Sequence, residues 1–441
     1  MREMKDSGIE WIGEIPKDWC VKNGKYVFNV YGMSVNDDFI SDTVEESYKI
    51  KYYKVDNLNE ATEQFYVKSN FANFSIKIYE IKGPIILVPK RGGAIYTNKV
   101  RIEKEACLFD SNIMGLTTNN NVRFMAYVLY GRGLSDIGDV TTIPQINKKH
   151  IDVLKIPVPS INEQEVIVEY LDTKCSEIDA TTEDIQKEIS LLEDYKKSVI
   201  TEAVTKGLNP DVEMKDSGIE WIGEIPKDWE FPKITHILDY THPYPIGDGD
   251  HGTIKAENYS EEGIPFIRVQ NLGFATELIM NNVVYITEKQ NNGIINSTLY
   301  PNDILFAKTG ATIGKVGIMP ENIKKANTTS HVGKITVSEE VVPKYIFYVL
   351  SSFIGYKQFW DIALMKSTRP ELSIDEIKTL HVLLPKTKEE QQQIADFLDT
   401  KCSEIDSLIA DKKRQLDILA DYKKSLIYEY VTGKKEVPVN E

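Results

Sequence analysis

Two glycine-containing loops carry donors suited to a polyanion. One covers 90–99 and begins Lys-Arg-Gly-Gly, and the other covers 308–315 and begins Lys-Thr-Gly. Lysine, threonine and free backbone amides can hold phosphates, whereas arginine, lysine, asparagine and glutamine can pair with base edges. Segment 268–271 adds such side chains at a strand end. The candidate DNA-binding residues are Lys90, Arg91, Thr97, Asn98, Lys99, Arg268, Gln270, Asn271, Lys308, Thr309, Thr312 and Lys315.

Each of these residues taken singly could be ordinary polar surface, but their recurrence at matched places in two halves favours DNA binding. Other chemistry finds less support. Gly310–Val316 approximates a phosphate-binding P-loop, yet Thr309 replaces its first glycine and valine follows its lysine. The carboxylates within 371–376 are too closely spaced for a nuclease cluster on separate strands. We find no motif for amino methylation, no cofactor loop and no metal-ligand spacing, so we predict no catalytic, cofactor or metal site.

The chain contains two exact or near-exact repeats. Residues 4–19 (MKDSGIEWIGEIPKDW) recur unchanged at 214–229, and the nine residues LDTKCSEID begin at both Leu171 and Leu398. The chain is therefore two half-molecules in tandem, each ending in the same helix. We expect 4–19 to be a compact loop that packs as a clip, with contact to a partner subunit as the alternative.

Long helices are predicted from Glu163 to about Thr205 and again after Thr387. Capping boxes open both, Ser160-x-x-Glu and Thr387-x-x-Glu, and Gly207 and Gly433 close them. Apolar residues recur every seven positions for about five heptads, which indicates a coiled coil. Tandem copies related by a pseudo-twofold axis require antiparallel pairing. The two rows are Leu171, Ile178, Ile185, Leu192 and Val199, and Leu398, Ile405, Lys412, Leu419 and Leu426; Lys196 and Lys412 are expected to extend their amines to water.

The intervening regions 20–160 and 231–378 consist of short β-rich runs, 94–96 among them, separated by turn residues, with helices near 123–130, 343–352 and 374–378. They indicate α+β domains with mostly antiparallel sheets. The predicted fold is thus α+β, with two pseudo-twofold-related halves, each a strand-rich domain followed by a long helix of an antiparallel coiled coil. The predicted segments are 1–160, 161–210, 211–386 and 387–441.

Composition places limits on the surroundings of the chain. The 441 residues carry a net charge of −15, whereas 20–160 and 231–378 are near neutral, at +3 and −2. The acidity therefore lies in the repeated segments, and the total charge argues against non-specific coating of DNA. No apolar run could span a membrane, and the N-terminus lacks a signal-peptide core. Cys175 and Cys402 lie at the same place in the two helix repeats, whereas Cys20 and Cys107 are scattered, and this usage fits a cytoplasmic, reducing location.

Several stretches together resemble one protein family across essentially the whole chain. They are the helix openings at 158–164 and 384–391, GIPFIRVQNL at 263–272, NDIL at 302–305 before KTG, and the segments 142–146 and 368–372. The sequence looks like the DNA-specificity subunit of a type I restriction-modification system. The first region departs from the pattern at 53–58 and 90–93, so its base-reading residues are less well defined.

The resemblance implies two target-recognition domains, each reading one half of a bipartite, asymmetric DNA sequence. It adds Arg369 to the DNA-binding candidates. The helices would act as a ruler and as a dock for two methyltransferase subunits, and through them for restriction subunits. S-adenosylmethionine would bind the methyltransferase and not this chain. We place Glu177 and Glu404, on the acidic outer face, at the dock. A coiled-coil adaptor without DNA recognition and a nuclease remain as alternatives.

Overall fold

The computed structural model describes residues 2–33, 40, 48–76, 78–139, 144–276, 278–365 and 370–438. It contains two compact units, one formed by 1–186 with 413–441 and the other by 187–412. Each unit joins one strand-rich domain to parts of both long helices. In the described part of the chain, no helix is long and apolar enough to cross a membrane.

The two long helices are α3 (Ile161–Lys206) and α8 (Lys388–Val431), as predicted. At their starts, Ser160 Oγ accepts the Glu163 N–H at 3.3 Å and Thr387 Oγ1 accepts the Glu390 N–H at 3.2 Å. At their ends, the next glycines adopt positive φ angles of 73° and 69°, a conformation that glycine tolerates best. The predicted caps are therefore present at both ends of both helices.

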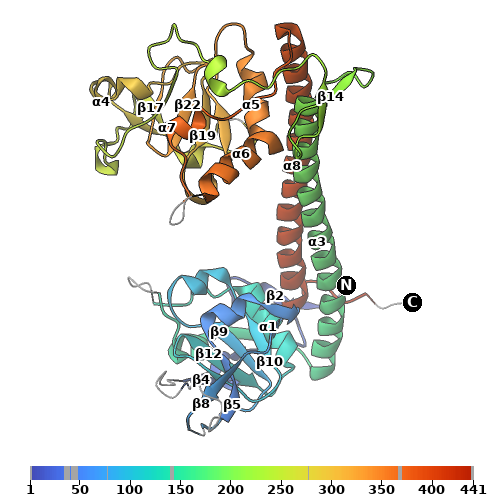
Figure 1. Cartoon of the computed structure of the whole chain (residues 1–441). Helices are drawn as coiled ribbons and strands as arrows, with labels where there is room; N and C mark the ends of the chain where they lie inside the picture. Colours follow the sequence, from blue (N-terminus) through green and yellow to red (C-terminus); the bar gives the residue numbers. More distant parts are fainter. Residues whose placement is uncertain are drawn as a thin grey trace. The chain divides into compact units, whose positions relative to one another are not determined.

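Within each unit the two helices run antiparallel (Figure 1). Most residues of the apolar rows are buried, among them Leu171, Ile178, Leu398 and Ile405. In the first unit Asp179 of α3 meets Lys423 of α8, and in the second Lys196 of α3 meets Asp406 of α8. Lys196 differs from the expectation, because its side chain is only 7% exposed and pairs with a carboxylate of the other helix instead of reaching water. Lys412 is likewise paired, with Glu188 at 2.5 Å.

The first unit is built on two sheets and one main helix, α1 (Val122–Arg132). All pairs of the larger sheet are antiparallel except β10 with β7, and the smaller sheet has one parallel pair, β11 with β5. The larger sheet has the order β4 (Phe28–Gly32), β12 (Ile113–Thr118), β9 (Ile85–Pro89), β10 (Arg101–Glu103), β7 (Tyr66–Val67), β6 (Ala61–Glu63), and the smaller β11 (Leu108–Phe109), β5 (Tyr48–Tyr53), β8 (Phe71–Phe74). The other elements are the pair β3 (Cys20–Asn23) and β13 (Lys155–Val158), α2 (Lys148–Val153), and the 3-10 helices η1 (Gly24–Tyr26), η3 (Val55–Asn59) and η4 (Gly92–Thr97).

The second unit repeats this plan with a longer helical part. A four-stranded antiparallel sheet packs against α5 (Pro343–Ser351) and α6 (Phe353–Leu364), as Figure 1 shows. Its order is β16 (Ile246–Asp248), β22 (Val332–Ile335), β19 (Ile304–Ala307), β20 (Val316–Ile318), and a smaller sheet has the order β18 (Val284–Ile286), β17 (Ile264–Ile267), β21 (Asn327–Thr328). The remaining elements are α4 (Glu288–Gly293), α7 (Ile374–Ile377), and the 3-10 helices η5 (Ile234–His236), η6 (Ala256–Asn258), η7 (Val269–Asn271), η8 (Ile295–Ser297) and η9 (Gly310–Thr312).

In both units one core extends from the sheet through the domain helix to the long helices. In the first unit it contains Ile86 of β9, Phe124 of α1, Leu171 of α3 and Ile427 of α8, all fully buried. The corresponding core of the second unit joins β19, α5, α3 and α8. The strand-rich domains and the long helices thus share their hydrophobic cores.

Two local predictions need correction. Residues 4–19 are not a loop but a hairpin, β1 (Met4–Ile9) with β2 (Gly13–Pro16), and the second copy forms β14 (Met214–Asp216) with β15 (Glu224–Pro226). The apolar run 94–96 is part of the 3-10 helix η4 and not a strand. Helices α2, α4 and α6 were not predicted, and the six residues of α2 and of α4 are too few to show a helical period.

Candidate nucleic-acid interface

The two glycine loops occupy equivalent places, because each follows a buried strand and is fixed by the same backbone bonds. Lys90 follows β9 and its carbonyl accepts the Ile146 N–H at 2.9 Å. Lys308 follows β19 and its carbonyl accepts the Leu372 N–H at 2.9 Å. Residues 144–146 and 370–372, the described parts of two segments recognised in the sequence, therefore support the loops through strand-like bonds.

The glycine two positions further along is equally matched. Gly92 N–H donates to Pro144 O at 2.9 Å, and Gly310 N–H donates to Pro370 O at 2.9 Å. Their φ angles are +71° and +63°, a left-handed conformation that costs other residues energy. The next residues, Gly93 and Ala311, are exposed.

A second matched turn reveals residues that the sequence did not single out. Asn271 Oδ1 accepts the backbone N–H of Arg268 at 2.9 Å, and Asn57 Oδ1 accepts that of Lys54 at 2.7 Å. Each turn is followed by a fully buried leucine. Lys54 and Asp56 thus occupy the places of Arg268 and Gln270, and the only signal was the weak likeness of KVDNL at 54–58 to RVQNL at 268–272.

Three predicted DNA-binding residues are buried in internal interactions. Asn271 is fully buried and also donates to Ile279 O at 2.7 Å. The Lys308 amine forms an ion pair with Asp248, and only 5% of its side chain is exposed. Thr309 is buried beside His331 at 3.1 Å. Their polar groups are engaged within the domain, where they stabilise the loops, and DNA contact by these three residues stays a prediction.

Three further candidates stabilise the loops while remaining partly exposed. Thr97 Oγ1 donates to Ala94 O at 2.6 Å and Thr312 Oγ1 donates to Thr309 O at 2.7 Å. Asn98 has a left-handed φ of 48° and donates to Tyr130 O at 2.8 Å. Their first task in the fold is to set the loop conformation.

The remaining described candidates present their polar groups at or near the surface. Arg91 and Gln270 are exposed, whereas Lys90 and Lys99 are half-buried. Arg268 lies 5.8 Å from the Tyr259 ring and Lys315 lies 5.9 Å from the Phe274 ring, so aromatic faces hold both cations. Arg369 lies outside the described residues.

The repeated part of each long helix holds its domain through a buried glutamine. Gln164 Oε1 accepts the Asn121 N–H at 2.9 Å, and Gln391 Oε1 accepts the Val342 N–H at 2.9 Å. Asn121 and Val342 precede the first residues of α1 and α5. Each glutamine therefore satisfies a backbone donor at the start of the domain helix, which would otherwise be unpaired.

An aspartate two turns later makes the second contact. Asp172 accepts from Tyr127 OH at 2.8 Å and pairs with Arg123. Asp399 accepts from Tyr348 OH at 2.7 Å and pairs with Lys344 at 2.5 Å. We call Gln164, Asp172, Gln391 and Asp399 the anchor residues, because they join equivalent positions of different domains to identical helix segments.

The predicted docking carboxylates lie on the repeated helices. Glu177 is 2.8 Å from Lys174 and Glu404 is 2.8 Å from Lys401, one turn away on the same helix. Their side chains are 58% and 56% exposed. Two exposed apolar pairs recur on the same helices: Leu191 and Tyr195 on α3, and Ile418 and Tyr422 on α8.

No cluster of three or more histidine, cysteine, aspartate or glutamate residues with metal-binding geometry occurs among the described residues. The segment 310–316 forms a 3-10 helix and a strand, which is not the strand–loop–helix arrangement of a P-loop.

The two domains each match a known family model. The type I restriction modification DNA specificity domain matches residues 16–191 and 226–417. The chain belongs to the type I restriction-modification DNA specificity family. Its two specificity domains are the two strand-rich domains with parts of the long helices that follow them.

Full-length relatives support the family assignment. The type I restriction enzyme MjaVIII specificity subunit of Methanocaldococcus jannaschii is 26% identical over 433 residues, with 96% of this chain and 94% of the relative covered. The putative MjaX specificity subunit of the same organism is 27% identical over 440 residues, covering 97% and 96%. A specificity subunit recognises DNA sequence and is not itself catalytic, as we predicted for this chain.

A solved structure confirms the fold. A chain from a study of complex assembly and conformational transition of the type I R-M system is 13% identical and has a TM-score of 0.63, covering 96% of this chain and 99% of that chain. The specificity domains, the internal repeat and the long helices of the predicted fold class are therefore correct.

Proposed function

We propose that this chain reads a bipartite, asymmetric DNA target, with one specificity domain on each half-site and the paired helices setting the distance between the half-sites. The proposal rests on the two glycine loops, 90–99 and 308–315, which we call the reading loops. Both domains present the same backbone framework at Gly92 and Gly310, but with different side chains around it. A shared framework with different donors suits two different base sequences.

Equivalent turn positions illustrate how the half-sites could differ. Arg268 and Gln270 in the second domain correspond to Lys54 and Asp56 in the first. Arginine suits guanine and glutamine suits adenine, whereas aspartate accepts from cytosine N4. The two half-sites would then differ, because different side chains stand on equivalent backbone positions of the two domains.

We further propose that two copies of one partner, a methyltransferase subunit carrying S-adenosylmethionine, bind the repeated helices and bring restriction subunits to the same DNA. Leu191 and Ile418 occupy equivalent repeat positions and are 68% and 66% exposed, and Tyr195 and Tyr422 are 56% and 54% exposed. Exposed apolar pairs beside Glu404 or Glu177 are typical of an interface with a polar rim. Equal patches on both helices suit two equal partners.

The direct test is to map methylated motifs in a host that carries this chain together with its methyltransferase. We expect one motif made of two different half-sites around an unspecified spacer. Replacing 231–378 with the domain of another specificity subunit should change only one half-site. An exchange that altered both half-sites, or binding that did not distinguish specific from random duplexes, would instead favour an adaptor without DNA recognition of its own.

A further inference from the structure

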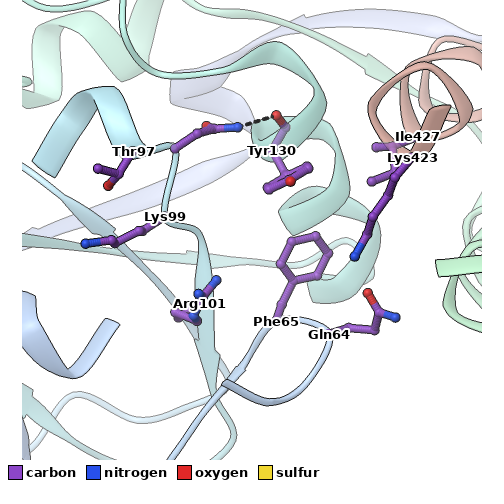
Figure 2. A pocket seen from close by; sticks show the side chains of 9 residues that line it. Gln64, Phe65, Thr97, Lys99, Arg101, Tyr130, Lys423 and Ile427 are labelled. Atoms are coloured by element: carbon purple, nitrogen blue, oxygen red, sulfur yellow. Dashed lines mark hydrogen bonds between the residues drawn. The ribbon is translucent and has the colours of Figure 1, made fainter. Parts of the chain in front are cut away.

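A cavity in the first unit lies between the domain and the end of α8 and has a volume of about 260 Å³, several times the roughly 30 Å³ that a water molecule occupies in the liquid. Its lining is cationic and aromatic, without a carboxylate. The lining residues are Gln64, Phe65, Thr97, Asn98, Lys99, Arg101, Tyr130, Lys423 and Ile427. Figure 2 shows Lys423 extending from α8 towards Gln64.

Arg101 is a cation of this cavity that combines a buried, unpaired donor with the lack of a carboxylate partner among the described residues. Its Nη1 donates to Val100 O at 2.8 Å, but its Nε is buried and has no hydrogen-bond partner. No carboxylate pairs with it among the described residues, and burial lowers its pKa. A guanidinium withdrawn from water without an anion is costly, because neither its charge nor all of its donors are satisfied.

The other two cations contribute differently. Lys423 is already paired with Asp179 at 2.6 Å, so it adds a donor but little net charge. Lys99 stands at the rim, next to the loop with the DNA-binding candidates, and its amine points away from Lys423 in Figure 2. Asn98 Oδ1 is a buried acceptor without a donor. A hydrated oxyanion would satisfy both groups, since a bridging water can donate to Asn98 and to the anion.

We propose that this cavity is a phosphate site, with Arg101 as its main ligand and Lys99 at its entrance. The phosphate belongs to the backbone of the duplex that the first specificity domain reads. This choice of DNA as the source rests on the proposed function. Phosphate contacts carry no sequence information but fix the register of a protein on DNA. The site would therefore orient the reading loop 90–99 on its half-site.

The salt dependence of DNA binding tests the proposal in the assembled complex. Arg101→Gln should reduce the slope of log K against log salt by about 0.9, because one phosphate contact is lost. Between 50 and 200 mM salt the variant should then lose about three- to fourfold less affinity than the wild type. The reduction should be the same on target and unrelated duplexes, and Arg101→Lys should restore the slope.

Lys155→Gln is the matched control, since Lys155 is an exposed lysine of the same domain that does not line the cavity. Lys99→Gln provides a second test that leaves the half-buried arginine in place. A second measurement compares thermal unfolding of the full chain in inorganic phosphate and in chloride at equal ionic strength, and Arg101→Gln should abolish any phosphate stabilisation.

The outcomes separate the two sources. A changed slope with Arg101→Gln but not with Lys155→Gln supports the DNA backbone as the source. If Arg101→Gln leaves the salt slope unchanged but abolishes stabilisation by phosphate, the cavity is a phosphate site, but DNA is not the source of the phosphate. No effect in either measurement overturns the site. If the wild-type complex recognises no DNA, the proposed function fails, and stabilisation by free phosphate alone decides the inference.

Discussion

Lys196 donates to both carboxylate oxygens of Asp406, at 2.8 and 2.7 Å, and so joins α3 to α8 in the second unit. In the first unit Lys423 makes the same bonds to Asp179, at 2.6 and 2.7 Å. Each residue of one pair is the repeat counterpart of a residue in the other. Because of the internal repeat, the same interhelical ion pair forms twice, as it does in the isologous interface of a symmetric dimer.

Breaking these two pairs should have unequal effects, because the lysines differ in burial. Asp406→Asn should destabilise the helix pair by about 1–3 kcal/mol, since Lys196, only 7% exposed, would lose its anion. Asp179→Asn should cost about 0–1 kcal/mol, because Lys423 is 21% exposed and water can solvate it. Thermal unfolding of the two variants side by side measures the order, and a larger loss for Asp179→Asn would contradict it.

The four cysteines should differ sharply in reactivity. Burial raises the pKa of Cys107 to about 12 and that of Cys402 to about 11, and it also raises the pKa of Cys175. These thiols should remain protonated and unreactive at pH 8, since the thiolate is the nucleophile. Exposed Cys20 should be alkylated first by iodoacetamide. Mass spectrometry of the native chain checks the order, with the unfolded chain as the control; rapid labelling of Cys402 would refute it.

The elements predicted correctly were those with a long period or a strong end signal. Five heptads, two capping boxes and two glycines define α3 and α8, because each signal repeats or lies at a fixed offset. The two glycine loops were found through Lys90 and Lys308, which follow buried strands. Their matched supports confirm the correspondence of the halves.

Sequence alone could not predict which polar residues the fold uses internally. Asn271 and Arg268 are neighbours in one recognisable run, yet the asparagine is fully buried and the arginine is half-exposed. Lys308 meets Asp248 across 60 positions, and such long-range pairs leave no local pattern. The sequence also contained no signal for the roles of Gln164 and Asp172, because their partners lie far away along the chain, in the strand-rich domain.

The anchor residues should act independently in the two units. Tyr127→Phe and Tyr348→Phe each remove one hydrogen bond to a charged anchor aspartate, at a cost of about 1.5–3 kcal/mol. Cys175 and Cys402 lie beside these hydroxyls and can report local loosening. We expect Tyr127→Phe to speed alkylation of Cys175 only, and Tyr348→Phe that of Cys402 only. Equal effects of either variant on both cysteines would exclude independent anchors.

Docking on the repeated helices should depend on the recurrent exposed side chains. Charge reversal of Glu177 and Glu404 together should weaken assembly with methyltransferase subunits, and so should Leu191→Ser with Ile418→Ser. One changed position should permit one bound partner, whereas both changes should permit none. Size-exclusion chromatography with light scattering measures the stoichiometry. Glu183→Lys, elsewhere on α3, serves as the charge control, and intact assembly of both double variants would count against this surface.

The ruler hypothesis predicts a change of spacer without a change of half-sites. Seven residues added to α3 and seven to α8, at positions that face each other, preserve the heptad rows and lengthen the pair by about 10 Å. DNA rises about 34 Å in 10 base pairs, so the spacer should grow by about three base pairs. Methylation mapping reads out both quantities. Insertion into α3 alone is the control, because it shifts the row containing Lys196 past its partners and should impair folding or activity. Altered half-sites around a constant spacer would show that the helices do not set the distance.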